Sequence, residues 1–273
     1  MIREPQILRG SSVGMVPVLL VALFLDYGNG VSPVILPASY LVGVLFAGIG
    51  AVVVLTMRLR SGAQVQRVEY SQFLRSLFAS SVENIGFNFN QITNVYFAAR
   101  LGEGMVAINA FAFRVGMLPL ALVSSQLGQI YQAWVARVRA KGERVSSLVF
   151  FALCIPNALI ALAMAYYGEE LVRLIYERGE FSPEHTALVA PLVVPYSAYF
   201  FVMSVNQLAA RHFFVFGAGK IYSISMISAY AFAFLGKLCV AENLSEIVWV
   251  CVIAEGIVSI FLILRILFSR ELK

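Results

Sequence analysis

The sequence predicts an all-α integral membrane protein with about eight transmembrane helices. Of its 273 residues, 60% are hydrophobic and 13% are charged, whereas a soluble domain of this size is normally about a quarter charged. Several apolar runs of roughly twenty residues match the hydrocarbon thickness of a bilayer. The strands of a membrane barrel would instead alternate between apolar and polar residues, so the runs favour helices.

The apolar runs place the eight predicted spans near residues 12–25, 33–57, 70–100, 105–135, 145–167, 187–208, 221–240 and 247–267. Lys and Arg gather at the amino terminus, after the second, fourth and sixth spans, and at the carboxyl terminus. The alternate connections, which include residues 169–185 and a last one expected to hold Lys237, are neutral or acidic. The positive-inside rule therefore puts both termini in the cytoplasm, and no cleavable signal peptide is evident.

The residues that cofactor or enzyme chemistry needs do not occur in recognisable patterns. Three cysteines stand singly in apolar runs, and His185 and His212 are isolated, so the sequence indicates no metal site. It contains no phosphate-binding glycine loop. We therefore expect no enzymatic activity and no cofactor. We also expect no nucleic-acid partner, because the positive charges behind the net charge of +5 are distributed as membrane topology requires.

The span at 70–100 is unusual because about half of its helical circumference is polar. At 3.6 residues per turn, the polar half carries Ser80, Ser81, Glu83, Asn84, Asn88, Asn90, Gln91 and Asn94. The opposite half suits lipid or packed protein and carries Val82, Ile85, Phe89, Ile92 and Tyr96. One or two amides would simply join helices, but so many predict one wall of a hydrated cavity. We expect Asn84, Asn88 and Gln91 to line a polar substrate path.

Arg114 is the strongest candidate for binding, because it falls about three turns inside the fourth span, where an ionisable side chain is costly. A guanidinium suits an anionic group such as phosphate; the alternative is an arginine that reaches the interface or a group of carbonyls. Glu83 could be its counter-ion, a proton or cation site, or a carboxylate at the mouth of packed helices. Glu255 is a second possible counter-ion, or a protonated and packed carboxyl. Pro119 predicts a kink in the same span.

Two turns outside the spans carry helix-end signals. The sequence predicts a sharp turn at Arg178-Gly179-Glu180-Phe181, with the glycine in a left-handed conformation, and predicts that Ser182-Pro183 starts the next helix. Arg211, at the inner end of the sixth span, fits a positive-inside anchor. Residues 217–220, beginning with Gly217, make the turn that follows.

Three motifs resemble the MurJ/MviN lipid II flippase family of the MATE-like exporter superfamily. Leu101-Gly102-Glu103-Gly104, followed by Ala112-x-Arg114 and Pro119, resembles the LGEG, AxR and P signature of that family's eighth helix. Residues 174–182 resemble its LxxRGxF turn, and residues 211–217 resemble its RxFYAxG motif at the inner end of helix ten. The resemblance covers roughly residues 65–270.

The resemblance implies a fold and a function. Residues 61–273 would form the six-helix carboxyl lobe of a two-lobed transporter, and residues 1–60 the last two helices of its amino lobe. That family carries an undecaprenyl-linked peptidoglycan precursor outward across the bacterial cytoplasmic membrane by alternating access. Arg114 would match the arginine proposed to contact the diphosphate, while Arg178, Gly179, Phe181, Arg211 and Gly217 would belong to the structural motifs.

The departures from the family pattern shape the hypotheses. Four amino-lobe helices and a terminal helix pair are absent, and Asn94, Phe113 and Met117 stand where the family commonly has acidic residues. We therefore expect an incomplete MATE-like fold in contact with membrane lipids, which pairs with another membrane subunit or with itself, or else a truncated gene. The leading hypothesis is a flippase-like protein for a polyprenyl-diphosphate-linked glycan. The alternatives are a non-transporting accessory subunit of a larger membrane complex and a drug or ion antiporter that depends on Glu83.

Overall fold

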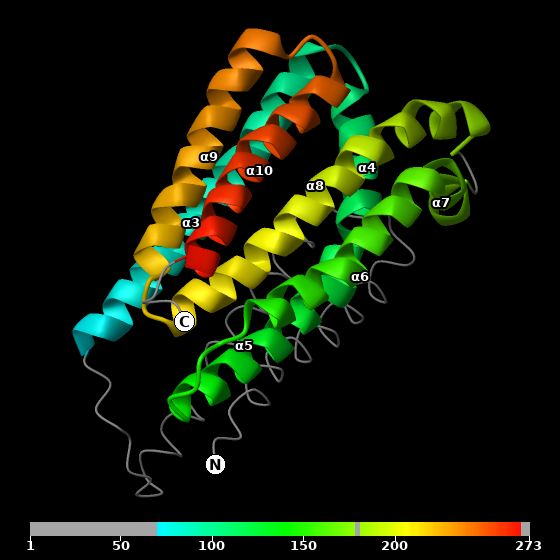
Figure 1. The fold of residues 1–273 in the computed structure, drawn as a ribbon. Helices are drawn as coiled ribbons and strands as arrows, with labels where there is room; N and C mark the ends of the chain where they lie inside the picture. Colours follow the sequence, from blue (N-terminus) through cyan, green and yellow to red (C-terminus); the bar gives the residue numbers. More distant parts are fainter. Residues whose placement is uncertain (1–69, 178–180, 269–273) are drawn as a thin grey trace, which may run out of the picture. The chain divides into compact units, whose positions relative to one another are not determined.

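The computed structural model describes the backbone of residues 70–177 and 181–268, and the side chains of these ranges from residue 85 onward. These ranges are helical apart from short connections (Figure 1). They contain α3 (Tyr70–Arg100), α4 (Met105–Pro119), the π-helical turn η1 (Leu120–Ser124), α5 (Ser125–Ala140), α6 (Ser147–Tyr166), α7 (Gly168–Tyr176), α8 (Pro183–Val215), α9 (Gly219–Val240) and α10 (Leu244–Phe268). We call these helices the bundle. The spans predicted at 12–25 and 33–57, and the domain predicted at 1–60, lie outside the described residues.

Five helical segments of the bundle are long and apolar enough to cross a membrane: Met105–Ala140, Ser147–Tyr166, Pro183–Val215, Gly219–Val240 and Leu244–Phe268. The prediction of an all-α integral membrane protein is confirmed. α3 has 31 residues, which at 1.5 Å per residue is about 46 Å and long enough to span. It is not among the five segments, because its amides and hydroxyls lower its hydropathy.

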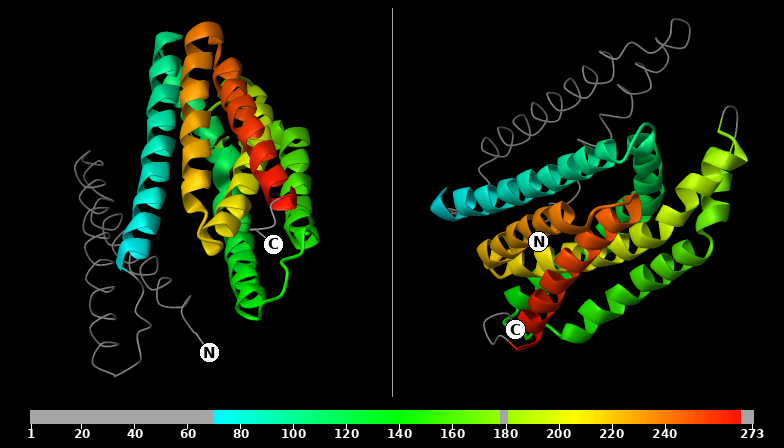
Figure 2. Two further views of the ribbon diagram at one scale, coloured as in Figure 1. Left: turned by 60° about the vertical axis from the view of Figure 1, so that its left-hand side comes forward. Right: turned by 90° about the horizontal axis from the view of Figure 1, so that it is seen from above.

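The bundle is built around α8, a helix of 33 residues. α4, α5, α6, α7, α9 and α10 all contact it. Figure 2 shows α3, α9 and α10 on one side of α8 and α6 on the other. α8 begins as predicted, with Ser182 as the N-cap, Pro183 in the first turn and the His185 ring accepting from the Ser182 N–H at 3.1 Å.

α8 extends to Val215, seven residues beyond the predicted end of the sixth span. It stops at Gly217, whose φ of 74° is left-handed. The Ala218 N–H donates to the Phe213 carbonyl at 2.8 Å and the Gly217 N–H to the Phe214 carbonyl at 3.1 Å. This is a Schellman motif. It confirms the start of the turn predicted at 217–220, whereas residues 219 and 220 already belong to α9.

The helix predicted to kink at Pro119 changes its hydrogen bonding there. α4 ends at Pro119, and the next five residues form η1 before α5 continues. A proline lacks the N–H that would donate to the preceding turn of an α-helix. The π-helical turn that follows contains one more residue per hydrogen-bonded ring than an α-helix does, and it accommodates the break. The buried Ser124 hydroxyl donates to the Asn157 Oδ1 on α6 at 2.6 Å, which holds the bend against the bundle.

α4 and α8 approach each other closely at Gly116. A Cβ built on this glycine would lie 2.5 Å from the Tyr196 Cβ. Beside the contact, the Tyr196 hydroxyl donates to the buried Asn109 Oδ1 at 2.6 Å. A glycine is therefore required at this crossing by space rather than by backbone conformation.

We predict that Gly116→Ala destabilises the protein by about 1–3 kcal/mol, the usual cost of overpacking a close contact. The measurement is thermal unfolding in a mild detergent. Gly256→Ala is the matched control, because the nearest atom to its added Cβ is 4.0 Å away, on Val202. Equal stability of the two variants would contradict the assigned contact.

Candidate functional site

The most polar part of the interior lies where α3, α8, α9 and α10 meet. Lys237 of α9 is 1% exposed and its Nζ donates to the Asn90 Oδ1 at 2.7 Å and to the Thr93 Oγ1 at 3.2 Å. Both acceptors belong to α3 and are themselves buried. An ammonium at this depth thus has two hydrogen-bond acceptors supplied by another helix.

The network continues from Asn90 to α8 and α10. The Asn90 Nδ2 donates to the Tyr199 hydroxyl at 3.4 Å, and that hydroxyl donates to the Glu255 Oε1 at 2.7 Å. The Cys251 Sγ donates to the Oδ1 atoms of Asn90 and Asn94, each at 3.6 Å. Glu255 is 0% exposed, so the four helices share one continuous polar interior at this point.

The position of Lys237 differs from the one expected from the sequence. We counted this lysine with the connection that holds Glu242 and Glu246. α9 ends at Val240, as the span predicted at 221–240 does, and Lys237 lies inside the last turn of the helix. The buried positions of α9 include Met226, Ala229, Ala233 and Lys237, at the three- and four-residue spacing of a packed helix face. That spacing was the available signal, and the apolar hydropathy pattern alone does not contain it.

The two halves of α3 separate as predicted, but the polar half is packed. Ile85 and Ile92 on the apolar half are 68% and 66% exposed. Asn90, Thr93 and Asn94 are buried and hydrogen-bonded to protein, so they do not line a hydrated cavity. The side chains of Glu83 and Asn84 lie outside the described residues, although both positions are helical.

Asn88 and Gln91 remain the described amides of α3 outside this network. Asn88 is exposed. Gln91 is partly buried, and its Nε2 has no hydrogen-bond partner among the residues that the structure describes. Gln91 lies nine residues before the end of α3, and Arg114 nine residues after the start of α4. Each is therefore about 14 Å along its own helix from the turn that joins the two.

Arg114 lies on the face of α4 that points away from α8. The neighbouring residues Ala112, Val115 and Gly116 are buried, whereas the Arg114 side chain is exposed. In residues 85–177 and 181–268, the ion pairs do not include this arginine. Of its two suggested counter-ions, Glu255 is engaged by Tyr199 and the side chain of Glu83 is not described.

Tyr176 at the end of α7 lies close enough to Arg114 for the two to interact electrostatically. Burial raises the pKa of the Tyr176 phenol, and the positive charge of Arg114 partly offsets this rise. The phenol donates to the Phe111 carbonyl on α4 at 3.4 Å. Its ring also contacts those of Phe111 and Phe181, with centroids 5.0 and 5.5 Å away. The predicted motif residue Phe181 thus joins the Arg114 region to the start of α8.

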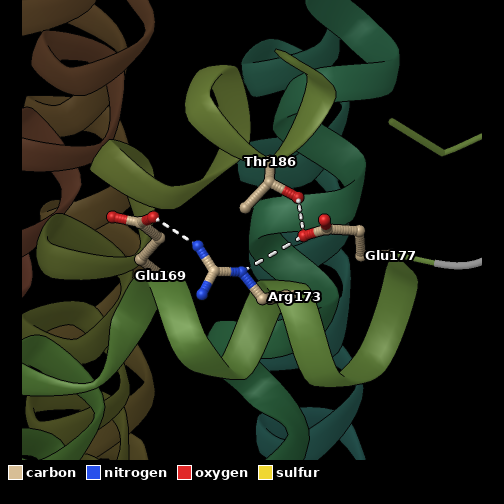
Figure 3. A network of polar contacts seen from close by, with 4 residues as sticks. All are labelled: Glu169, Arg173, Glu177 and Thr186. Atoms are coloured by element: carbon tan, nitrogen blue, oxygen red, sulfur yellow. Dashed lines mark hydrogen bonds and ion pairs between the residues drawn. The ribbon is translucent and has the colours of Figure 1, made fainter. Parts of the chain in front are cut away.

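A charged network holds α7 to α8 at the same end of the bundle (Figure 3). The Arg173 guanidinium lies 2.9 Å from a Glu169 oxygen and 3.4 Å from a Glu177 oxygen. The Thr186 hydroxyl on α8 donates to the same Glu177 oxygen at 3.2 Å. The acidic segment predicted between the fifth and sixth spans therefore contains a helix that its own ion pairs support, and the Thr186–Glu177 hydrogen bond joins it to α8. Arg178 and Gly179 lie outside the described residues.

Arg211 contacts protein at the opposite end of the bundle. Its Nη1 donates to the Gln132 Oε1 on α5 at 3.3 Å. The adjacent His212 is buried, and its Nδ1 lies 2.8 Å from the Tyr131 hydroxyl, also on α5. Arg139 donates to the Val215 carbonyl, and its guanidinium lies 5.1 Å from the centre of the Phe216 ring. Residues 211–217 therefore join α8 to α5, which the sequence pattern did not reveal.

The helices and their buried ionisable groups define a polytopic α-helical membrane protein. This chain is similar to two curated relatives, each described as a probable lipid II flippase MurJ. The relative from Rhizobium meliloti is 32% identical over 103 residues, which cover 34% of this chain and 18% of the relative. The relative from Synechocystis sp. is 26% identical over 215 residues, which cover 74% of this chain and 37% of the relative.

The chain therefore spans less than two fifths of the length of either relative. No protein-family model matches the sequence, and no solved structure matches the fold. In the described ranges, no group of three or more His, Cys, Asp and Glu side chains is placed to hold a metal ion.

We predict that Lys237→Met lowers the free energy of unfolding by about 3–5 kcal/mol, because it leaves Glu255 without its buried counter-charge. Thermal unfolding in mild detergent measures the change. Lys220→Met provides the control, since Lys220 is exposed at the start of the same helix and its loss should cost less than about 0.5 kcal/mol. A loss of stability as small for Lys237→Met as for Lys220→Met would refute the role of the network.

Proposed function

We propose that this chain is a flippase-like membrane protein that handles a polyprenyl-diphosphate-linked glycan of the lipid II type. The proposed location is the bacterial cytoplasmic membrane, with both termini in the cytoplasm. Support comes from the similarity to the two probable lipid II flippases and from the membrane-spanning helices of the bundle. The alignment with the Synechocystis relative covers most of the described helices by length, which favours a shared bundle over a shared short motif.

Arg114 carries the proposal. It is an exposed arginine within the membrane-crossing segment Met105–Ala140, and hydrocarbon is a costly surrounding for a guanidinium. Water, another protein surface or an anionic ligand must therefore face it when the bundle lies in a membrane. A diphosphate suits this position because its oxygens accept paired hydrogen bonds from the planar guanidinium.

The sugar part of the substrate needs hydrogen-bonding groups as well as an anion contact. Asn88 is an exposed amide of α3, and Gln91 is partly buried one turn further along the same helix. In the proposal these two amides form the polar path, and the side chains of Glu83 and Asn84 lie outside the described residues. The apolar chain of the substrate would lie in lipid.

The proposal includes a second membrane subunit, or a second copy of this chain, opposite Arg114. A transporter of this kind needs two surfaces that open alternately around its substrate. The exposed face of α4 that carries Arg114 is one such surface. A pull-down from mild detergent tests for the facing subunit.

The direct test is binding of undecaprenyl diphosphate to the purified full chain in nanodiscs, with native mass spectrometry as the readout. Loss of a charged hydrogen bond of about 1.5–3 kcal/mol predicts a roughly ten- to hundredfold weaker interaction for Arg114→Ala. Arg114→Lys should recover part of it, because lysine keeps the charge without the paired geometry. Arg173→Ala is the matched control on α7, where the arginine serves the surface network.

Equal binding by the wild type and Arg114→Ala would overturn the role of Arg114. A wild-type chain that binds no diphosphate and copurifies with a subunit unrelated to transporters would favour the accessory-subunit alternative. Rescue of a strain depleted of its lipid II flippase, by this chain with its partner, provides the cellular counterpart. In that strain, Arg114→Ala should fail at unchanged membrane levels.

A further inference from the structure

Two ionisable side chains lie wholly inside the membrane-spanning helices, away from Arg114. Lys237 on α9 and Glu255 on α10 are 1% and 0% exposed. The two side chains are joined by hydrogen bonds through Asn90 and Tyr199. A single buried charge is expensive in hydrocarbon, whereas two opposite charges in one network offset part of each other's cost. Such groups inside membrane proteins commonly mark sites where ions or protons bind.

The hydrogen bonds between these two groups all point in one direction. The Lys237 ammonium donates to Asn90, Asn90 donates to Tyr199, and Tyr199 donates to Glu255. An ammonium can only donate, and an ionised carboxylate can only accept. The chain therefore fits a charged lysine at one end and a charged carboxylate at the other, and aligned bonds of this kind strengthen one another.

Tyr199 allows the carboxylate to take up a proton without losing its neighbour. A phenol hydroxyl both donates and accepts. When a hydronium ion transfers a proton to Glu255 and leaves as water, an O–H bond forms on one carboxyl oxygen while the other can still accept from the Tyr199 hydroxyl. The network then carries one more positive charge, and the Lys237 ammonium has lost its counter-charge.

The phenol and thiol groups around this site ordinarily change charge in a different pH range from a carboxyl group. Tyr199 also interacts with Tyr230 on α9 and with Cys251 on α10. Phenols and thiols ordinarily lose their protons only in alkaline solution. α3 contributes Asn90, Thr93 and Asn94, which do not titrate. Among the carboxyl, phenol and thiol groups of this cluster, the Glu255 carboxyl is the type that ordinarily titrates in acidic solution.

We propose that Glu255 is a proton-binding site, with Lys237 as its internal counter-charge, and that binding of a proton weakens the hold of Lys237 on α3. Lys237 donates to Asn90 and Thr93, both of which belong to α3. An ammonium without a counter-charge is less stable in the buried position, which favours separation of α3 from α9. The site stands independently of diphosphate binding at Arg114.

Infrared difference spectroscopy of the full chain in nanodiscs tests the site between about pH 4 and 9, where ordinary carboxyl groups and histidines titrate. The wild type should show a carboxylic-acid C=O band that appears on acidification and is lost in Glu255→Gln. Glu170→Gln, at an exposed position on α7, should keep the band. A band that is absent, or that persists in Glu255→Gln, would overturn the proposal. So would a band that responds to sodium in place of choline at constant pH, because that result identifies a metal-cation site.

Hydrogen exchange measured by mass spectrometry tests the effect on α3. Peptides covering residues 85–100 should exchange faster in the wild type at the pH where the acid band appears. Glu255→Gln resembles the protonated acid and should exchange at the fast rate at every pH. The change of exchange rate with pH in the wild type is the result that a purely structural contact would not predict. Exchange of these peptides that does not follow the acid band in the wild type would overturn the link to α3. If Glu255→Gln does not fold, Tyr199→Phe replaces it, and an unchanged band and exchange profile in that variant would count against the proposal.

Discussion

The structure depends on the rule that a polar group buried among membrane helices must find its partner within the protein. Three neutral hydrogen bonds follow it at helix crossings: Tyr196 to Asn109, Ser124 to Asn157, and Ser259 to Asn206. The Asn206 Nδ2, like the Gln91 Nε2, is a buried donor with no partner among the described residues. The three hydrogen bonds join α4 to α8, η1 to α6, and α8 to α10. The Lys237 network does the same for α3, α8, α9 and α10 with charged groups. Apolar packing fills the bundle, while these few polar contacts specify which helices face one another.

The sequence predicted most of the helices because their signals are local. Hydropathy located the membrane-crossing segments, Ser182-Pro183 marked the start of α8, and Gly217 marked its end. Ends were less accurate where tertiary contacts decide them. Arg211 and His212 look like the charged end of a span, but their partners on α5 keep them inside α8. Partners this far apart in sequence have no local pattern.

The candidate site was predictable in its residue types and less so in its geometry. The periodicity of α3 separated polar from apolar residues correctly, yet it did not distinguish a wet face from a packed one. Asn90 and Asn94 are packed because Lys237 and Cys251 come from helices some 150 residues later. Arg114 and Lys237 show the same contrast. Each is a cation among apolar residues in the sequence, but Lys237 has acceptors within the bundle whereas Arg114 faces outward.

The π-helical turn after Pro119 affects how Arg114 can move. It divides one membrane-crossing segment into α4, of 15 residues, and α5, of 16 residues. The Ser125 N–H reaches back to the Leu120 carbonyl, and the Ser125 hydroxyl donates to the Ala121 carbonyl at 2.6 Å, so the bend keeps its hydrogen bonds. The segment thus consists of two short helices, α4 and α5, joined at a bend whose backbone groups are hydrogen-bonded. A tilt of α4 would move Arg114 relative to the membrane, while α5 stayed in place because Tyr131 and Arg139 hold it to α8.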